Sequence, residues 1–72
     1  MKTVADLKRG ENGVIRSFSD QEMSLKLLEM GCLPGTEVLL TATAPFGDPI
    51  VIKISGYCLS MRRNEAATIL LE

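Results

Sequence analysis

Two runs of alternating apolar residues, on either side of a proline-containing loop, most constrain how this chain can fold. Residues 37–44 read EVLLTATA and residues 49–55 read PIVIKIS. Successive side chains of a β-strand point to opposite sides, so a period of two is typical of a strand with one buried face. The side chains expected on the two buried faces are Val38, Leu40, Ala42, Ala44, Ile50, Ile52 and Ile54. The two runs therefore predict a β-hairpin whose loop is formed by residues 45–49.

The predicted hairpin loop reads PFGDP and places an aromatic residue, Phe46, at a turn. Gly47 is expected to adopt a positive φ, and neither Pro45 nor Pro49 has to donate a hydrogen bond to the sheet at this position. Water reaches a turn easily, so two interpretations of Phe46 are open. Its ring folds back onto the core, or it stays exposed as an anchor for a binding partner.

The rest of the chain predicts three further short strands, at residues 14–18, 57–61 and 68–71. The polar stretch RRNEAA before the last strand predicts a bend or a single helical turn. Pro34–Gly35 suits the two central positions of a type II turn. Gly56 is expected to break the chain between the two strands that it separates.

One helix is expected from about Asp20 to Met30. Ser19 and Asp20 can each cap its N-terminus, and Glu22 lies three residues after Ser19, which is the spacing of a capping box. Gly31 stands where a helix commonly ends in a left-handed residue.

Five short strands with one helix inserted after the first predict a mainly β fold, with residues 1–72 as a single domain. Strands this short cannot form a two-layer sandwich, but they can curl into a small five-stranded β-barrel. Aromatic residues make up only 4% of the chain, so the interior is expected to be aliphatic. A domain of this size buries only about 60% of the surface that its unfolded chain exposes, which implies a thin core.

The predicted helix has two apolar sides. Met23, Leu27 and Met30 form one stripe, which is expected to face the core. Leu25 and Leu28 fall on nearly the opposite side of the helix. Two interpretations of this second side are open: Leu28 reaches a flank of the core and Leu25 is an ordinary exposed leucine, or both form a docking surface.

The residue types present argue against catalysis and against a metal centre. The chain has no histidine, which excludes Ser-His-Asp and Cys-His arrangements and the usual zinc sites with histidine ligands. Two cysteines are too few for a four-thiolate site; Cys58 is expected to face outward and Cys32 to act as a small apolar side chain. We therefore predict no catalytic residue, no metal ligand and no cofactor.

Charge and cysteine content indicate a reduced protein of the cytoplasm that does not bind nucleic acid. The formal net charge is −1, from 8 basic and 9 acidic side chains, whereas nucleic-acid binding domains are usually basic. No secretory signal or apolar run long enough to span a bilayer is present. Arg62 and Arg63 are expected to lie in a solvated bend, with Glu65 paired locally to an arginine.

Three segments resemble the ferrous iron transport protein A family: LLEMGCLPGTEV, APFGDPI and ISGYCLSMRRNEAATIL. They occur in the family's order and cover about residues 27–70, and the first strand and the helix fit more loosely. The specific part is Leu-x-x-Met-Gly-x-x-Pro-Gly followed by Ala-Pro-x-Gly-Asp-Pro. The residues that carry the structural motif are Met30, Gly31, Pro34, Gly35, Pro45, Gly47, Asp48, Pro49 and Gly56.

The resemblance implies an SH3-like barrel with an inserted helix. It also implies an accessory role in bacterial ferrous iron uptake, through contact with the GTP-binding or membrane part of the ferrous iron permease. The domain would then reach the inner face of the cytoplasmic membrane only through this partner. Members occur as separate proteins and fused ahead of the permease, and the chain suits both. Leu25, Leu28 and Phe46 are the candidate partner-binding residues.

Two alternatives remain from the sequence. The same barrel occurs as the C-terminal domain of iron-dependent repressors similar to the diphtheria toxin repressor, which implies a metal-sensing or metal-delivery domain. Against this alternative, only a short turn and a strand precede the helix, where a repressor would have a DNA-binding winged helix. The other alternative is weak self-association through the same apolar surface.

Overall fold

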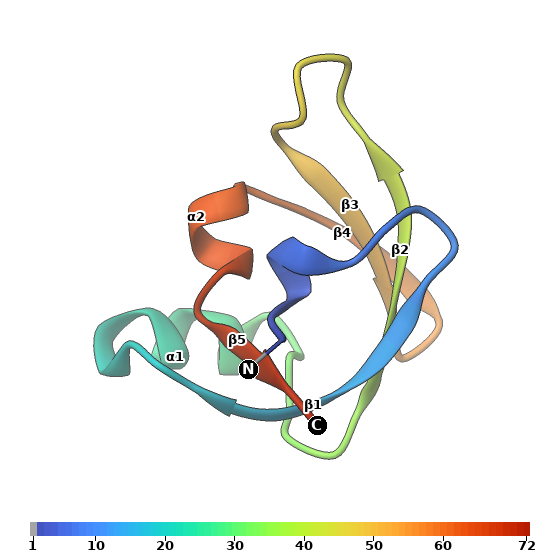
Figure 1. The fold of residues 1–72 in the computed structure, drawn as a ribbon. Coiled ribbons are helices and arrows are strands. Elements are labelled where there is room, and N and C mark those ends of the chain that lie inside the picture. The colour runs from blue at the N-terminus through green and yellow to red at the C-terminus, as the bar shows by residue number, and fades with distance from the viewer. Residues whose placement is uncertain (1) are drawn as a thin grey trace.

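The predicted hairpin lies at the centre of a five-stranded antiparallel sheet in the computed structural model, which describes residues 2–72 (Figure 1). Met1, the first residue of the predicted domain, lies outside the described residues. The elements, in chain order, are η1 (Val4–Asp6), β1 (Asn12–Phe18), α1 (Gln21–Glu29), β2 (Glu37–Thr43), β3 (Ile50–Ile54), β4 (Tyr57–Met61), α2 (Arg63–Ala66) and β5 (Ile69–Leu71). The predicted five strands and inserted helix are confirmed, and RRNEAA forms the single turn of α2.

The sheet is curved, as predicted, and its two end strands do not pair with each other to close it. Its strand order is β4-β3-β2-β1-β5, so β4 and β5 are its two ends, and α2 carries the chain from one to the other. The outer edge of β5 is covered by the N-terminal segment, because Thr3 bridges to Leu70 and the backbone N–H of Leu71 donates to Lys2. The outer edge of β5 is therefore paired with residues 2–3 and not with β4.

The alternation predicted for residues 37–44 holds only for its first half. Val38 and Leu40 are buried as expected, but Ala42 is exposed. The register between β2 and β3 shifts between Leu40 and Ala42, which leaves Thr41 as the extra residue of a β-bulge. A bulge reverses the faces beyond it, so the prediction that Ala42 faces the core is wrong.

The core is aliphatic, as the low aromatic content predicted. The curved sheet encloses it, and α1 and α2 lie at its side (Figure 1). Leu27 is the buried residue of α1, while Met23 and Met30 are partly buried against the same core, which confirms the predicted stripe. The buried hydrophobic residues are Val4, Leu7, Ile15, Leu27, Cys32, Val38, Leu40, Ile50, Ile52, Ile54, Met61, Ala66, Ile69 and Leu71.

Helix α1 begins with Asp20 as its N-cap rather than with Ser19. The carboxylate of Asp20 accepts a hydrogen bond from the backbone N–H of Met23 at 3.1 Å. The position that a capping box would fill is therefore Met23, which has no group to return the bond, so the capping box predicted between Ser19 and Glu22 is wrong.

The C-terminal end of α1 is fixed by Gly31 and Tyr57. Gly31 has a φ of +100°, as predicted for a left-handed residue after a helix. The hydroxyl of Tyr57 donates to the backbone carbonyl of Met30 at 2.8 Å and lies 2.0 Å from the point where a Cβ of residue 31 would stand. A side chain at position 31 would thus collide with the tyrosine that holds the helix end. The other predicted turn glycines, Gly35, Gly47 and Gly56, also have positive φ.

Candidate partner-binding surface

Five large apolar side chains are exposed on the surface of residues 2–72: Leu25, Leu28, Leu33, Phe46 and Tyr57. Phe46 is 99% exposed, so it is almost free of contact with the rest of the domain, and Leu25 is 66% exposed. Large exposed apolar side chains are the usual anchors of protein interfaces. These residues define two candidate surfaces, one at the β2–β3 loop and one along α1.

The β2–β3 loop projects from the body of the domain and carries Phe46 at its tip (Figure 1). The backbone N–H of Gly47 donates to Ala44 at 2.7 Å, and that of Ala44 donates across the loop to Pro49 at 3.0 Å. The loop backbone is thus hydrogen-bonded on both sides of Phe46, whereas the ring of Phe46 makes no packing contact. Of the two interpretations of Phe46, the structure shows the exposed one.

Arg63 ties this loop to the body, a contact that the sequence did not predict. Its Nε donates to the carbonyl of Gly47 at 2.8 Å and its Nη1 to the carbonyl of Ala5 at 2.7 Å. Its backbone N–H donates to a carboxylate oxygen of Asp48 at 2.9 Å. The expected solvated bend is therefore wrong for Arg63, which is half-buried. Gly47 and Asp48, two residues of the structural motif, therefore bond a residue outside the hairpin, Arg63.

The second surface lies along α1, where both Leu25 and Leu28 are exposed. Leu33 and Tyr57 were not predicted to belong to it. The hydroxyl bond to Met30 places Tyr57 at the C-terminal end of α1, and Leu33 follows that end by a few residues. Tyr57 is 43% exposed as the first residue of β4, whereas Met61 at the other end of this strand is buried.

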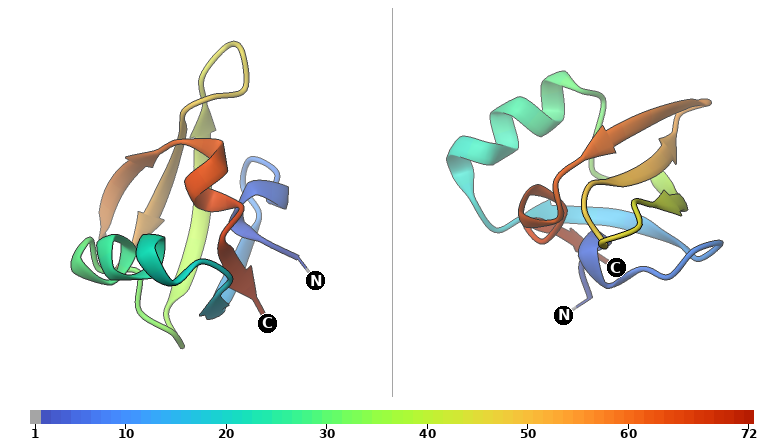
Figure 2. Two further views of the ribbon diagram at one scale, coloured as in Figure 1. Left: turned by 90° about the vertical axis from the view of Figure 1, so that its left-hand side faces the viewer. Right: turned by 90° about the horizontal axis from the view of Figure 1, so that it is seen from above.

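The two candidate surfaces lie at opposite ends of the domain. The tip of the β2–β3 loop and helix α1 are far apart in two views turned by 90° (Figures 1 and 2). The greatest extent of the fold is only 29 Å. A single small epitope cannot include both Phe46 and Leu25, so a partner that uses both must be large or must contact the domain at two places.

Helix α1 is also linked to α2 by an ion pair between Lys26 and Glu65, whose charged atoms are 2.7 Å apart. The expectation that Glu65 pairs with an arginine side chain is wrong: its other oxygen accepts the backbone N–H of Arg62. The hydrogen bond from Lys26, and then the bond from the Arg62 backbone, lower the pKa of Glu65 below its ordinary value. The carboxylate form of Glu65 is therefore favoured in the folded state.

We expect the contribution of Lys26 to stability to depend on pH. A carboxyl whose folded pKa is lowered stabilises the fold above its unfolded pKa of about 4.3, and this contribution is lost as the pH falls through the folded value. Lys26→Gln should therefore lower the free energy of unfolding by about 0.5–1 kcal/mol at pH 7 and by much less at pH 2.5. Urea denaturation of both proteins at the two pH values measures this. An equal loss at both would contradict the role assigned to the pair.

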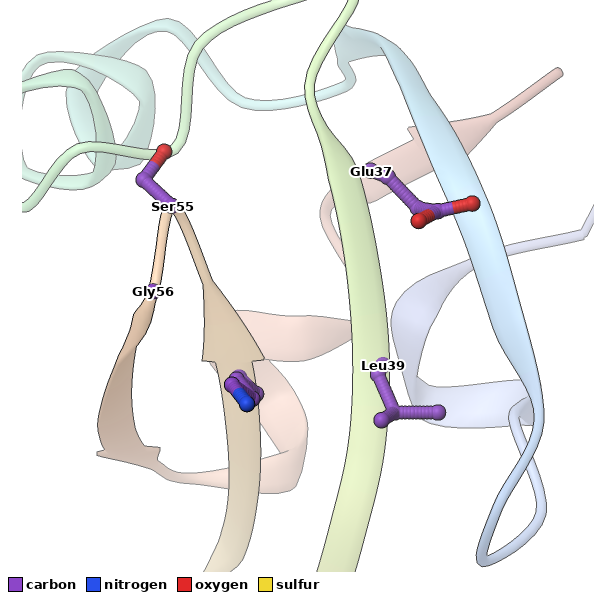
Figure 3. Close-up of a pocket in the computed structure, with 5 residues that line it drawn as sticks. Glu37, Leu39, Ser55 and Gly56 are labelled. Carbon is purple, nitrogen blue, oxygen red and sulfur yellow. The ribbon is translucent and has the colours of Figure 1, made fainter.

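A shallow depression of about 270 Å³ lies on the sheet, lined by Glu37, Leu39, Lys53, Ser55 and Gly56 (Figure 3). Figure 3 shows Glu37 and Leu39 pointing toward β1, whereas Ser55 points away from them. The carboxylate of Glu37 accepts a hydrogen bond from the side-chain amide of Asn12 on β1, at 3.3 Å. These polar groups do not converge on a common point, so we assign no catalytic site to the depression.

The chemistry of the cysteines and carboxylates does not fit a metal centre. Within residues 2–72, no three or more Cys, Asp or Glu side chains lie where they could hold one ion. Cys32 is fully buried, and burial raises the pKa of its thiol, which disfavours the thiolate that a metal needs. Cys58 is exposed, as predicted.

In the part of the chain that the structure describes, no helix has the length and the apolar character needed to cross a membrane.

The fold is that of a small SH3-like domain. The crystal structure of Stenotrophomonas maltophilia FeoA complexed with zinc, described as a prokaryotic SH3 domain protein, superposes with a TM-score of 0.85 over all of this chain and 91% of that one, at 22% identity. A manganese-dependent transcriptional repressor shares the fold, with a TM-score of 0.87 at 17% identity over 97% of this chain and 35% of that one.

Residues 2–72 match the family described as the FeoA domain, and the chain belongs to this family. The solution structure of the FeoA-like protein from Clostridium acetobutylicum is 31% identical, with a TM-score of 0.90 over all of this chain and 87% of that one. The Fe(2+) transport protein A/Fe(2+) transporter FeoB fusion protein of Porphyromonas gingivalis is 33% identical over 70 residues, which are 96% of this chain. The chain spans only 8% of the length of that fusion protein.

Proposed function

We propose that this domain is an accessory module of ferrous iron uptake that binds and regulates a GTP-dependent ferrous iron permease. Membership of the FeoA family supports the process, and the fusion relative supports the partner, because there both parts belong to one polypeptide. The observation that carries the proposal is Phe46, an aromatic ring that is 99% exposed at the tip of a loop with a bonded backbone. The domain works in the cytoplasm, at the inner face of the membrane, where the permease holds it.

Phe46 and the α1 surface (Leu25, Leu28) are the proposed anchors. Burying an exposed phenylalanine or leucine side chain at an interface stabilises the complex by about 1.5–3 kcal/mol. Because the two surfaces lie at opposite ends of the fold, a permease that uses both has a large interface or contacts the domain at two separate places. Leu33 and Tyr57 extend the surface at the end of α1.

Phe46→Ser should weaken binding to the permease about tenfold or more and leave the melting temperature within about 2 °C of the wild type. An interface anchor loses its buried area on truncation, whereas a side chain without packing contacts adds little to the stability of the free domain. Binding is measured by titrating the domain into the purified full-length permease in detergent, with GDP and with a non-hydrolysable GTP analogue. Ser19→Ala, a change of an exposed side chain outside the β2–β3 loop, is the control.

Two results would count against the proposal. Wild-type affinity in Phe46→Ser would show that the ring is no anchor, and a large loss of melting temperature would show that it supports the fold.

The second candidate function, metal sensing or delivery, is supported by the shared fold of the manganese-dependent repressor and by the zinc complex of a relative. Stoichiometric, sub-micromolar binding of Fe(II) to the wild-type domain in anaerobic calorimetry would favour that function instead.

A further inference from the structure

The β2–β3 loop extends beyond the sheet that supports it. β1 pairs with β2 as far as Leu39, residues 10 and 11 bond Leu40, and β4 pairs with β3 as far as Ile50. The last rung of the hairpin itself joins Thr43 to Ile50, and the loop lies beyond it. The loop that carries Phe46 therefore has no neighbouring strand of the sheet.

The guanidinium of Arg63 gives the loop the support that no neighbouring strand provides. Nε and Nη1 belong to one rigid planar group, and they bond the carbonyl of Gly47 in the loop and the carbonyl of Ala5 in η1. Ala5 packs against the hydrophobic core, so the guanidinium connects the loop to the fixed part of the domain. The backbone N–H of Arg63 adds a bond to Asp48. The bonded residues, Gly47 and Asp48, directly follow Phe46 in the chain.

We propose that Arg63 is a positioning residue for Phe46: it holds the loop in one conformation, so that the ring meets the permease already in place. This inference rests on the proposed function, and it assigns to Arg63 no contact with the permease. A side chain held in its bound geometry loses less conformational freedom on binding, which favours affinity. Hydrogen bonds from a charged guanidinium to carbonyls are stronger than neutral ones, which suits this task.

Arg63→Met tests the proposal, because methionine keeps an unbranched stem of similar length and removes the donors. Arg62→Met is the matched control: it removes the same charge one residue earlier, where the side chain is exposed and the backbone N–H still bonds Glu65. Amide hydrogen exchange, followed by NMR, reports on the loop through Gly47, whose N–H donates to Ala44. The N–H of Leu40, which donates to Glu11 inside the sheet, is the internal reference.

In Arg63→Met, the amide exchange rate of Gly47 relative to that of Leu40 should rise about tenfold or more. In Arg62→Met it should stay unchanged, since the two charge-assisted bonds are lost only in Arg63→Met. Binding to the full-length permease should weaken about tenfold in Arg63→Met, and the further change Phe46→Ser should then have a smaller effect than in the wild type. Arg63→Lys should give an exchange rate and an affinity between those of the wild type and Arg63→Met, because one ammonium group cannot take the place of both donors. It also carries the comparison if Arg63→Met does not fold.

Unchanged exchange at Gly47 in a folded variant overturns the inference. Faster exchange with wild-type affinity overturns it as well, provided that Phe46→Ser weakens binding. If the wild-type domain does not bind the permease, the proposed function fails; if it binds and Phe46→Ser binds equally well, Phe46 is no anchor. In both cases exchange at Gly47 alone then decides whether Arg63 holds the loop. The two failures are therefore distinguishable.

Discussion

Leu27→Ala should lower the free energy of unfolding by about 3 kcal/mol, a large part of the total for a domain of 72 residues. Leu27 is the one residue of α1 that is fully buried, and Met23 and Met30 beside it are only partly so. Truncation loses the free energy gained by burying the leucine side chain, and it leaves a cavity between helix and sheet that the surrounding structure fills only in part. Urea denaturation followed by far-UV circular dichroism measures the change.

Leu25→Ala is the matched control for this experiment, since it makes the same change two residues earlier on the same helix. Leu25 is 66% exposed, so stability should change by less than about 0.5 kcal/mol. If Leu25 is an anchor for the permease, the control variant should lose affinity instead. Similar losses of stability at both positions would mean that α1 is not held by its Leu27 side.

Gly31→Ala should destabilise the domain by about 2–3 kcal/mol. Residue 31 has a φ of +100°, which an alanine adopts only with strain of about 1–2 kcal/mol. The new Cβ would also stand 2.0 Å from the hydroxyl oxygen of Tyr57, so this side chain must move and give up its bond to Met30. The lost hydrogen bond adds about 1 kcal/mol. Thermal and urea denaturation measure the sum.

A double-mutant cycle with Tyr57→Phe separates the two causes. Phenylalanine removes the oxygen that collides with the Cβ, and with it the bond to Met30. Gly31→Ala should therefore cost about 1 kcal/mol less in the Tyr57→Phe background than in the wild type. Additive effects would attribute the whole loss to the backbone conformation and none to the collision.

The strands could be predicted because each has one buried face, and burial of one face imposes a period of two on the sequence. This reasoning fails at Thr41, where a single extra residue reverses the faces of β2. Nothing in the alternation of TATA marks which residue is the extra one, since alanine and threonine are tolerated on either side. The neighbours of β5 were visible only in part for a similar reason: β5 pairs with β1 on one side, and on the other with residues 2–3, which have no strand pattern of their own.

Leu25, Leu28 and Phe46 could be predicted from the sequence as partner-binding candidates, because apolar residues in polar or turn positions are visible in the pattern. Arg63 could not be predicted, because the bonds of its side chain reach across 16 and 58 residues of chain. Its neighbour Arg62 is of the same residue type and is exposed, so only the fold distinguishes the two. The contact of Tyr57 with α1 could not be predicted either, because alternation gives a face of the sheet but not the helix end that lies beside it.

The contact of Tyr57 with the end of α1 also gives the domain a built-in optical probe. The chain has one tyrosine and no tryptophan, so its intrinsic fluorescence comes almost entirely from the seam between β4 and α1. Circular dichroism, in contrast, averages over every strand. Recording both during denaturation therefore shows, without any label, whether the helix leaves the sheet before the strands separate.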